Sequence, residues 1–122
     1  MNFKEDVDPH DLTQFQPATW ILWSATILYC EEFGLPLTIT SLISDRENVK
    51  AVSNTHETGR AFDISVRGWT EQSIHRFCFI MNRNYRDIAA ISASTGLERA
   101  AVYHDNHIHL QVKMGVSVNK FI

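Results

Sequence analysis

Three histidines lie close together near the end of the chain, in the segment YHDNHIHL that runs from Tyr103 to Leu110. The dipeptide Asp105-Asn106 in its middle tolerates the positive φ that a tight hairpin turn requires. A two-residue turn there places His104 opposite His107. Because side chains alternate along a strand, His104, His107 and His109 then share one face of the hairpin. The spacing therefore predicts a cluster of imidazoles on one sheet face.

The other face of this hairpin, whose strands we expect at residues 100–104 and 107–112, is apolar. A histidine inside a core is usually single, and neighbours satisfy its two nitrogens. Three histidines on the face away from the core therefore indicate metal binding or catalysis rather than packing. The side chains expected to face the core instead are Ala101, Tyr103, Ile108, Leu110 and Val112.

A carboxylate is available on another predicted strand, AFDISV, at residues 61–66. Its apolar residues alternate with Asp63 and Ser65, so we expect Asp63 to point away from the core. A catalytic zinc ion takes three protein ligands from histidine and carboxylate and keeps one position open for water. Asp63 and His109 are candidates, and Gly59 can turn the chain so that His56 converges with Asp63. A surface histidine and a strand-end aspartate are the alternative.

The remaining elements follow from periodicity and from helix-end signals. Residues 17–33 predict an amphipathic helix with Pro17 in its first turn and Gly34 after its last. Residues 37–43 predict a strand, and residues 44–58 a polar loop. Thr70 is the expected N-cap of a second helix. The apolar stripe of that helix is Ile74, Phe77, Cys78, Met81, Tyr85 and Ile88.

Together these elements predict an α+β domain in which two helices pack on one face of a small, mainly antiparallel sheet. The zinc cleft is expected on the other face. The length of 122 residues suits a single domain over residues 1–122, with residues 1–16 as an N-terminal extension. Cys30 and Cys78 suit buried thiols, although a disulfide between them is an open alternative.

Composition excludes several classes of partner. The net charge is -3, and the sequence has no run of three Lys or Arg residues, so nucleic-acid binding is not expected. The polar start of the chain does not resemble a signal peptide, and apolar stretches are too short for a membrane span. We expect a monomer that is made in the cytoplasm without a leader.

The segment SNTHETGRAFDI, residues 53–64, closely resembles the S-x-H-x-x-G-x-A-x-D signature of the M15 family of zinc metallopeptidases. This family contains D-Ala-D-Ala carboxypeptidases and dipeptidases and L-alanyl-D-glutamate endolysins. The segment HIHLQV, residues 107–112, resembles the part that carries the last zinc histidine there and in the related Hedgehog signalling domain. Residues 40–48 resemble the segment that contains a substrate-binding arginine, here Arg46.

The resemblance implies that His56, Asp63 and His109 bind Zn²⁺, although such ligands also suit other divalent ions. Many members place a glutamate general base three residues before the last ligand, where this chain has Asn106. A subset carries a histidine five residues before it, which here is His104. His104 is therefore the expected general base and acid, while His107 orients water or stabilises the transition state. Asp105 is a weaker candidate for the base.

By the same resemblance, the expected activity is hydrolysis of a peptide bond in the stem peptides of bacterial peptidoglycan. The bond is left open between D-Ala-D-Ala, L-Ala-D-Glu and other stem linkages. The context would be a phage or prophage endolysin that reaches the wall through a membrane lesion made by another protein. The alternatives are a non-catalytic zinc-binding module of the same fold and a virion-associated protein that degrades the wall during entry.

Overall fold

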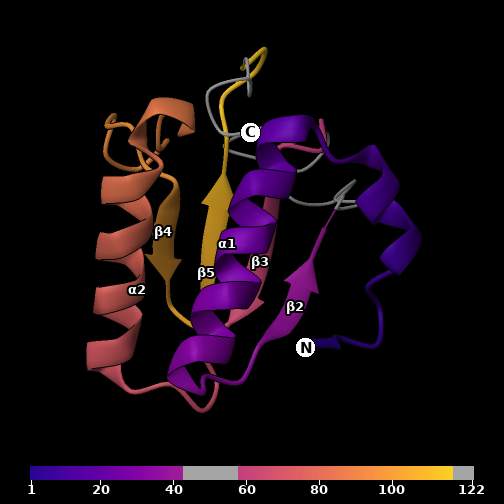
Figure 1. The fold of residues 1–122 in the computed structure, drawn as a ribbon, viewed down its shortest axis with the longest axis vertical. Helices are drawn as coiled ribbons and strands as arrows, with labels where there is room; N and C mark the ends of the chain where they lie inside the picture. The colour runs from indigo at the N-terminus through magenta and orange to yellow at the C-terminus, as the bar shows by residue number, and fades with distance from the viewer. Residues whose placement is uncertain (43–57, 117–122) are drawn as a thin grey trace.

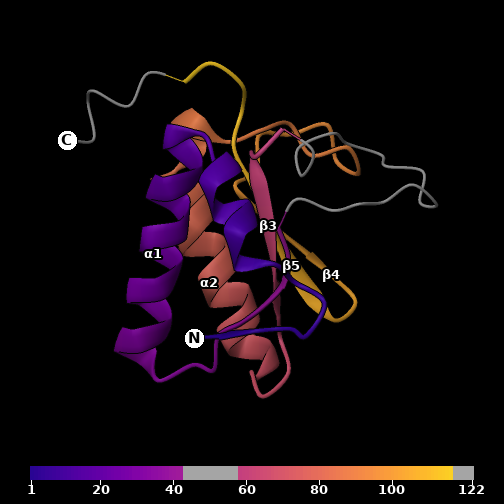
Figure 2. The ribbon, with the colours of Figure 1, turned by 90° about the vertical axis from the view of Figure 1, so that its right-hand side faces the viewer.

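Among the described residues, two helices cover one face of a sheet, and the other face of the sheet carries no helix (Figure 2). This computed structural model describes residues 1–42 and 58–116. The helices are α1 (Pro17–Phe33) and α2 (Glu71–Asn84). Two short 3-10 helices, η1 (Pro9–Gln14) and η2 (Arg86–Ile88), complete the helical elements of the described ranges. The predicted α+β architecture, with its helices on one side, is confirmed.

The described part of the chain forms a sheet of five strands in the order β1-β2-β3-β5-β4 (Figure 1). Its middle strands are β3 (Ala61–Ser65) and β5 (His107–Gln111), which pair antiparallel. Beyond them lie β4 (Ala101–His104), antiparallel to β5, and β2 (Thr38–Ser41), antiparallel to β3. β1 (Asn2–Phe3) adds a parallel edge to β2. Residues 1–16 thus contribute a strand to the sheet, and Phe15 contributes a buried ring to the core.

The helix ends follow the signals in the sequence. Pro17 lies in the first turn of α1, and Gly34 ends it at φ 65 with its N–H donating to the Cys30 and Glu31 carbonyls. Thr70 caps α2 through a capping box with Ser73. The apolar stripe predicted to continue α2 to Ile88 overstates the helix, because α2 ends at Asn84. Ile88 is fully buried, but it is held there by the separate helix η2.

The core lies between the helices and the sheet. Phe62 and Ile64 of β3 and Ile108 of β5 are fully buried on this face, as the alternation predicts. Tyr103 was also expected to face the core, but 38% of it is exposed. The reason is its place on the outermost strand, where its ring meets the exposed His75 of α2 edge-on and its hydroxyl donates to the Asp105 carbonyl.

Asn82 of α2 ties the outermost strand to the helix layer. Its side-chain amide donates to the Ala101 carbonyl and accepts from the Ala101 N–H, both at 2.9 Å. The amide thereby replaces the two backbone hydrogen bonds that a further strand would make with Ala101.

Among the described residues, no helix is long and apolar enough to cross a membrane.

Both cysteines are free thiols on the helix side of the fold, so the disulfide alternative does not hold. Burial raises the pKa of Cys30 from 9.0 to about 11 and the pKa of Cys78 from 9.0 to about 12. A rise of two units lowers the reactive thiolate fraction at pH 8 by about 100-fold.

We therefore expect both thiols to be alkylated by iodoacetamide at pH 8 at least about 50-fold more slowly in the native protein than in urea. Mass spectrometry of the time course measures this rate for each cysteine. Rapid modification of either thiol under native conditions would contradict its buried, neutral state.

Candidate functional site

The helix-free face of the sheet presents three successive rows of side chains across β3, β5 and β4. The register pairs Ser65 with His107, and His107 in turn with His104. The next row pairs Asp63 with His109 and Val102. The third row pairs Ala61 with Gln111. Since directly opposed residues share a face, the first two rows bring Asp63 and the three histidines to the same surface.

The hairpin has the register that the sequence predicts. His104 opposes His107, Tyr103 opposes Ile108, and Val102 opposes His109. Asp105 takes φ 46 in the turn, as the first residue of such a turn requires. The local turn therefore fixes which side of the sheet carries the imidazoles.

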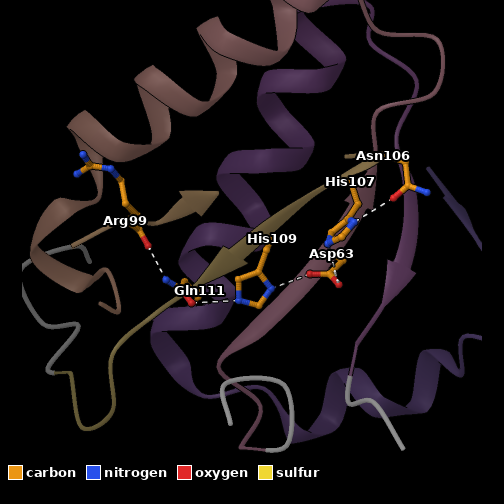
Figure 3. Close-up of polar contacts among 6 residues, drawn as sticks. All are labelled: Asp63, Arg99, Asn106, His107, His109 and Gln111. Carbon is orange, nitrogen blue, oxygen red and sulfur yellow. Dashed lines mark hydrogen bonds and ion pairs between the residues drawn. The ribbon is translucent and has the colours of Figure 1, made fainter. Parts of the chain in front are cut away.

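Asp63 and His109 form the centre of the site (Figure 3). The His109 Nδ1 atom lies 2.7 Å from Asp63 Oδ1. The side chain of Asp63 is 5% exposed, and that of His109 is 15% exposed. Asp63 therefore points away from the helix-side core, as predicted, yet it is largely shielded from solvent. A carboxylate and an imidazole in close contact in such a place can hold a proton or a cation between them.

His107 stands next to this pair. Its Nε2 atom lies 4.0 Å from the second carboxylate oxygen, Asp63 Oδ2. Its other nitrogen, Nδ1, is 3.1 Å from Asn106 Oδ1. His104 lies one strand further out and is exposed, with its ring centroid 5.8 Å from that of His107. His107, the residue expected to orient water or stabilise the transition state, is thus beside Asp63, whereas His104, the expected general base and acid, lies further away.

The other side of His109 is held by Gln111. The Gln111 Oε1 atom lies 3.0 Å from His109 Nε2. The Gln111 amide nitrogen donates to the Arg99 carbonyl at 3.0 Å and to the Ala90 carbonyl at 3.4 Å. Gln111 is 2% exposed, so this chain of contacts is buried under the surface of the site. Gln111 is not among the site residues predicted from the sequence, although its place two residues after His109 on a strand signals that the two side chains share a face.

The start of β3 is anchored to the helix layer by Gly59 and Arg60. Gly59 has φ 69, and its carbonyl accepts from the backbone N–H of Gln16 at 3.1 Å and from the Thr19 hydroxyl at 2.7 Å. Arg60 is buried, and burial lowers its pKa. Its guanidinium donates to the Thr58 hydroxyl and to the Val112 carbonyl. These contacts hold the strand that carries Asp63 in place at its first residue.

A cleft of about 570 Å³ opens beside Asp63 and His107. It runs over β2 and the ends of β3 and β5, and its lining includes Thr40, Ser41 and the cationic residues Lys4 and Arg67. Thr40 and Ser41 are adjacent in sequence yet both line the cleft. The pairing of β2 with β3 shifts register between Ile39 and Ser41, and such irregularities turn neighbouring side chains toward one side.

Two of the predicted site residues, His56 and Arg46, lie outside the described residues. Within residues 1–42 and 58–116, no group of three or more His, Cys, Asp or Glu side chains is arranged to hold a metal ion. The described part thus brings together two of the three predicted zinc ligands, Asp63 and His109. Their donor atoms, one carboxylate oxygen and one imidazole nitrogen, are of the types that zinc prefers.

Comparisons of this chain with family models, with curated proteins and with solved structures find no match. The resemblance to the zinc metallopeptidases therefore rests on the residues quoted from the sequence.

Replacing Gly59 by Ala tests how tightly the start of β3 is anchored. A Cβ atom there would overlap the Gln14 carbonyl oxygen, and the positive φ is unfavourable for alanine. We expect Gly59→Ala to lower the free energy of unfolding by about 3 kcal/mol in urea titrations. Gly96→Ala is the matched control, because Gly96 has φ 71 with open space around it. A loss of about 1 kcal/mol is expected for the control, and equal losses would refute the overlap.

Proposed function

We propose that this chain is a zinc-dependent peptidase that cleaves a stem peptide of bacterial peptidoglycan. The observation that carries the proposal is the Asp63–His109 pair, with His107 beside it at the edge of a cleft. The sequence motif supplies the third ligand, His56, and the substrate class follows from the resemblance. The proposed context is a phage or prophage endolysin, with a virion-associated protein as the alternative.

The chain's own residues divide the work. Asp63 and His109 present the two donor atoms, and both are shielded enough for their charges to act strongly. A zinc ion held by these residues and His56 would lower the pKa of a water molecule and polarise the substrate carbonyl. The cleft holds the peptide over β2 and β3, with hydroxyl groups available from Thr40 and Ser41. Arg46 is the proposed grip on a substrate carboxylate or on the oxyanion.

Proton transfer falls to the histidine pair. Asn106 stands where many family members have a glutamate, and its side chain contacts His107 Nδ1 instead. With that nitrogen engaged, His107 Nε2 is the atom that faces Asp63 and the cleft. We propose His107 as the group that takes up and returns the proton, with the exposed His104 as its neighbour. The assignment of the base to His104 from the sequence stays the competing prediction.

A non-catalytic zinc-binding module is the second candidate. The observation that favours it is Asn106, since an amide cannot accept the proton that the family's glutamate takes. Such a module would bind zinc through the same pair and leave peptidoglycan intact.

Digestion of purified peptidoglycan tests the activity. We expect the protein to release fragments whose masses identify one stem-peptide bond, to lose this activity with a chelator and to regain it with added zinc. Asp63→Asn should lower the rate at least about 100-fold because it removes a ligand charge. His75→Ala is the control, since His75 is exposed on α2, behind the sheet. Bound zinc with intact peptidoglycan would instead support the non-catalytic module.

Separate alanine variants of His107 and His104 identify the acid–base group. We expect His107→Ala to lower kcat by about 100-fold or more while zinc content stays at the wild-type level. His104→Ala should lower kcat by less than about 10-fold. Steady-state kinetics on the released fragment, with metal analysis of each variant, measures both. The reverse order of losses would return the role to His104.

A further inference from the structure

Gln111 connects the candidate site to the backbone behind it. Its side chain spans the space between the His109 ring and the carbonyls of Ala90 and Arg99. Figure 3 shows its contacts with His109 and Arg99. These carbonyls belong to the segment between α2 and β4. A buried amide with partners at both ends has little freedom to turn.

The partners of Gln111 determine which way round its amide lies. A backbone carbonyl oxygen can only accept a hydrogen bond, so the NH₂ group of Gln111 must face Arg99 and Ala90. Its Oε1 atom must then face His109. Because Oε1 can only accept, the His109 Nε2 atom at 3.0 Å must carry a hydrogen and donate it.

We propose that Gln111 is a positioning residue that keeps the hydrogen of His109 on Nε2 and thereby directs the Nδ1 lone pair toward Asp63. A neutral imidazole has one N–H, and here it lies between two acceptors, Gln111 Oε1 and Asp63 Oδ1. This single N–H can donate to only one of the two acceptors. When it donates to Gln111 Oε1, the His109 Nδ1 atom and Asp63 Oδ1 face each other at 2.7 Å with a lone pair on each. An additional proton or a cation is then needed between them.

This arrangement prepares the Asp63–His109 pair for a metal ion. Ligand histidines are generally oriented by a hydrogen bond from their other nitrogen, and losing such a partner typically weakens metal binding by 10- to 100-fold. The consequence for zinc rests on the proposed function. The position of the hydrogen on His109 does not, because it follows from the contacts of the metal-free chain.

Nitrogen-15 NMR of the histidine rings in the metal-free protein at pH 8 tests the first step. The His109 signals are assigned by their loss in His109→Ala. We expect Nε2 to carry a hydrogen in the wild type. In Gln111→Met, which keeps the side-chain length but removes the acceptor, the hydrogen should move to Nδ1, where Asp63 accepts it. Gln16→Met is the matched control, because Gln16 donates to the Thr58 carbonyl and, within residues 1–42 and 58–116, to no imidazole.

Zinc affinity, measured by competition with a chromophoric chelator, tests the second step. Gln111→Met should bind zinc about 10- to 100-fold more weakly than the wild type. A hydrogen on Nδ1 alone in the wild type overturns the proposal whether or not Gln111→Met folds. A folded Gln111→Met with unchanged ring signals and zinc affinity overturns it too. A wild type that has the Nε2 hydrogen but binds no zinc contradicts the proposed function and leaves the role of Gln111 standing.

Discussion

The antiparallel pairing of β3 with β5 is the constraint on which the rest of the site depends. It joins residues that are 46 positions apart, Asp63 and His109, and sets them side by side. A shift of one residue in this register would send Asp63 into the helix-side core and Ile64 to the open face. Burial of Phe62, Ile64, Ile108 and Leu110 under the helices therefore fixes the same register that creates the polar pair.

Local signals in the sequence were enough for several parts of the fold. Helix α1 begins and ends where Pro17 and Gly34 place it, and Thr70 caps α2. The two-residue turn at Asp105-Asn106 sets the partners of all three histidines. Each of these features depends on residues within one turn or one hairpin, so the chain encodes them without reference to distant segments.

Features that depend on distant segments were not predictable in the same way. The exposure of Tyr103 follows from the position of β4 at the sheet edge. The alternation of apolar and polar residues along a single strand does not predict the order of strands in the sheet. The end of α2 at Asn84 follows from the turn into η2, although the apolar stripe continues to Ile88. The role of Gln111 depends on its hydrogen bonds to the carbonyls of Ala90 and Arg99. The lining of the cleft depends on the register shift in the pairing of β2 with β3. The likeness of residues 53–64 to a zinc-peptidase motif is, by contrast, a statement about His56, whose structure lies outside the described ranges.

The two hydrogen bonds between Asn82 and Ala101 affect how this protein can self-associate. An open sheet edge is a template on which a second chain can add a strand, and this is a common start of aggregation. On β4 the amide of Asn82 already takes both backbone groups of Ala101 that face outward. An incoming strand would have to displace the Asn82 side chain before it could form hydrogen bonds with Ala101. Helix α2 therefore opposes self-association at the sheet edge next to the histidines.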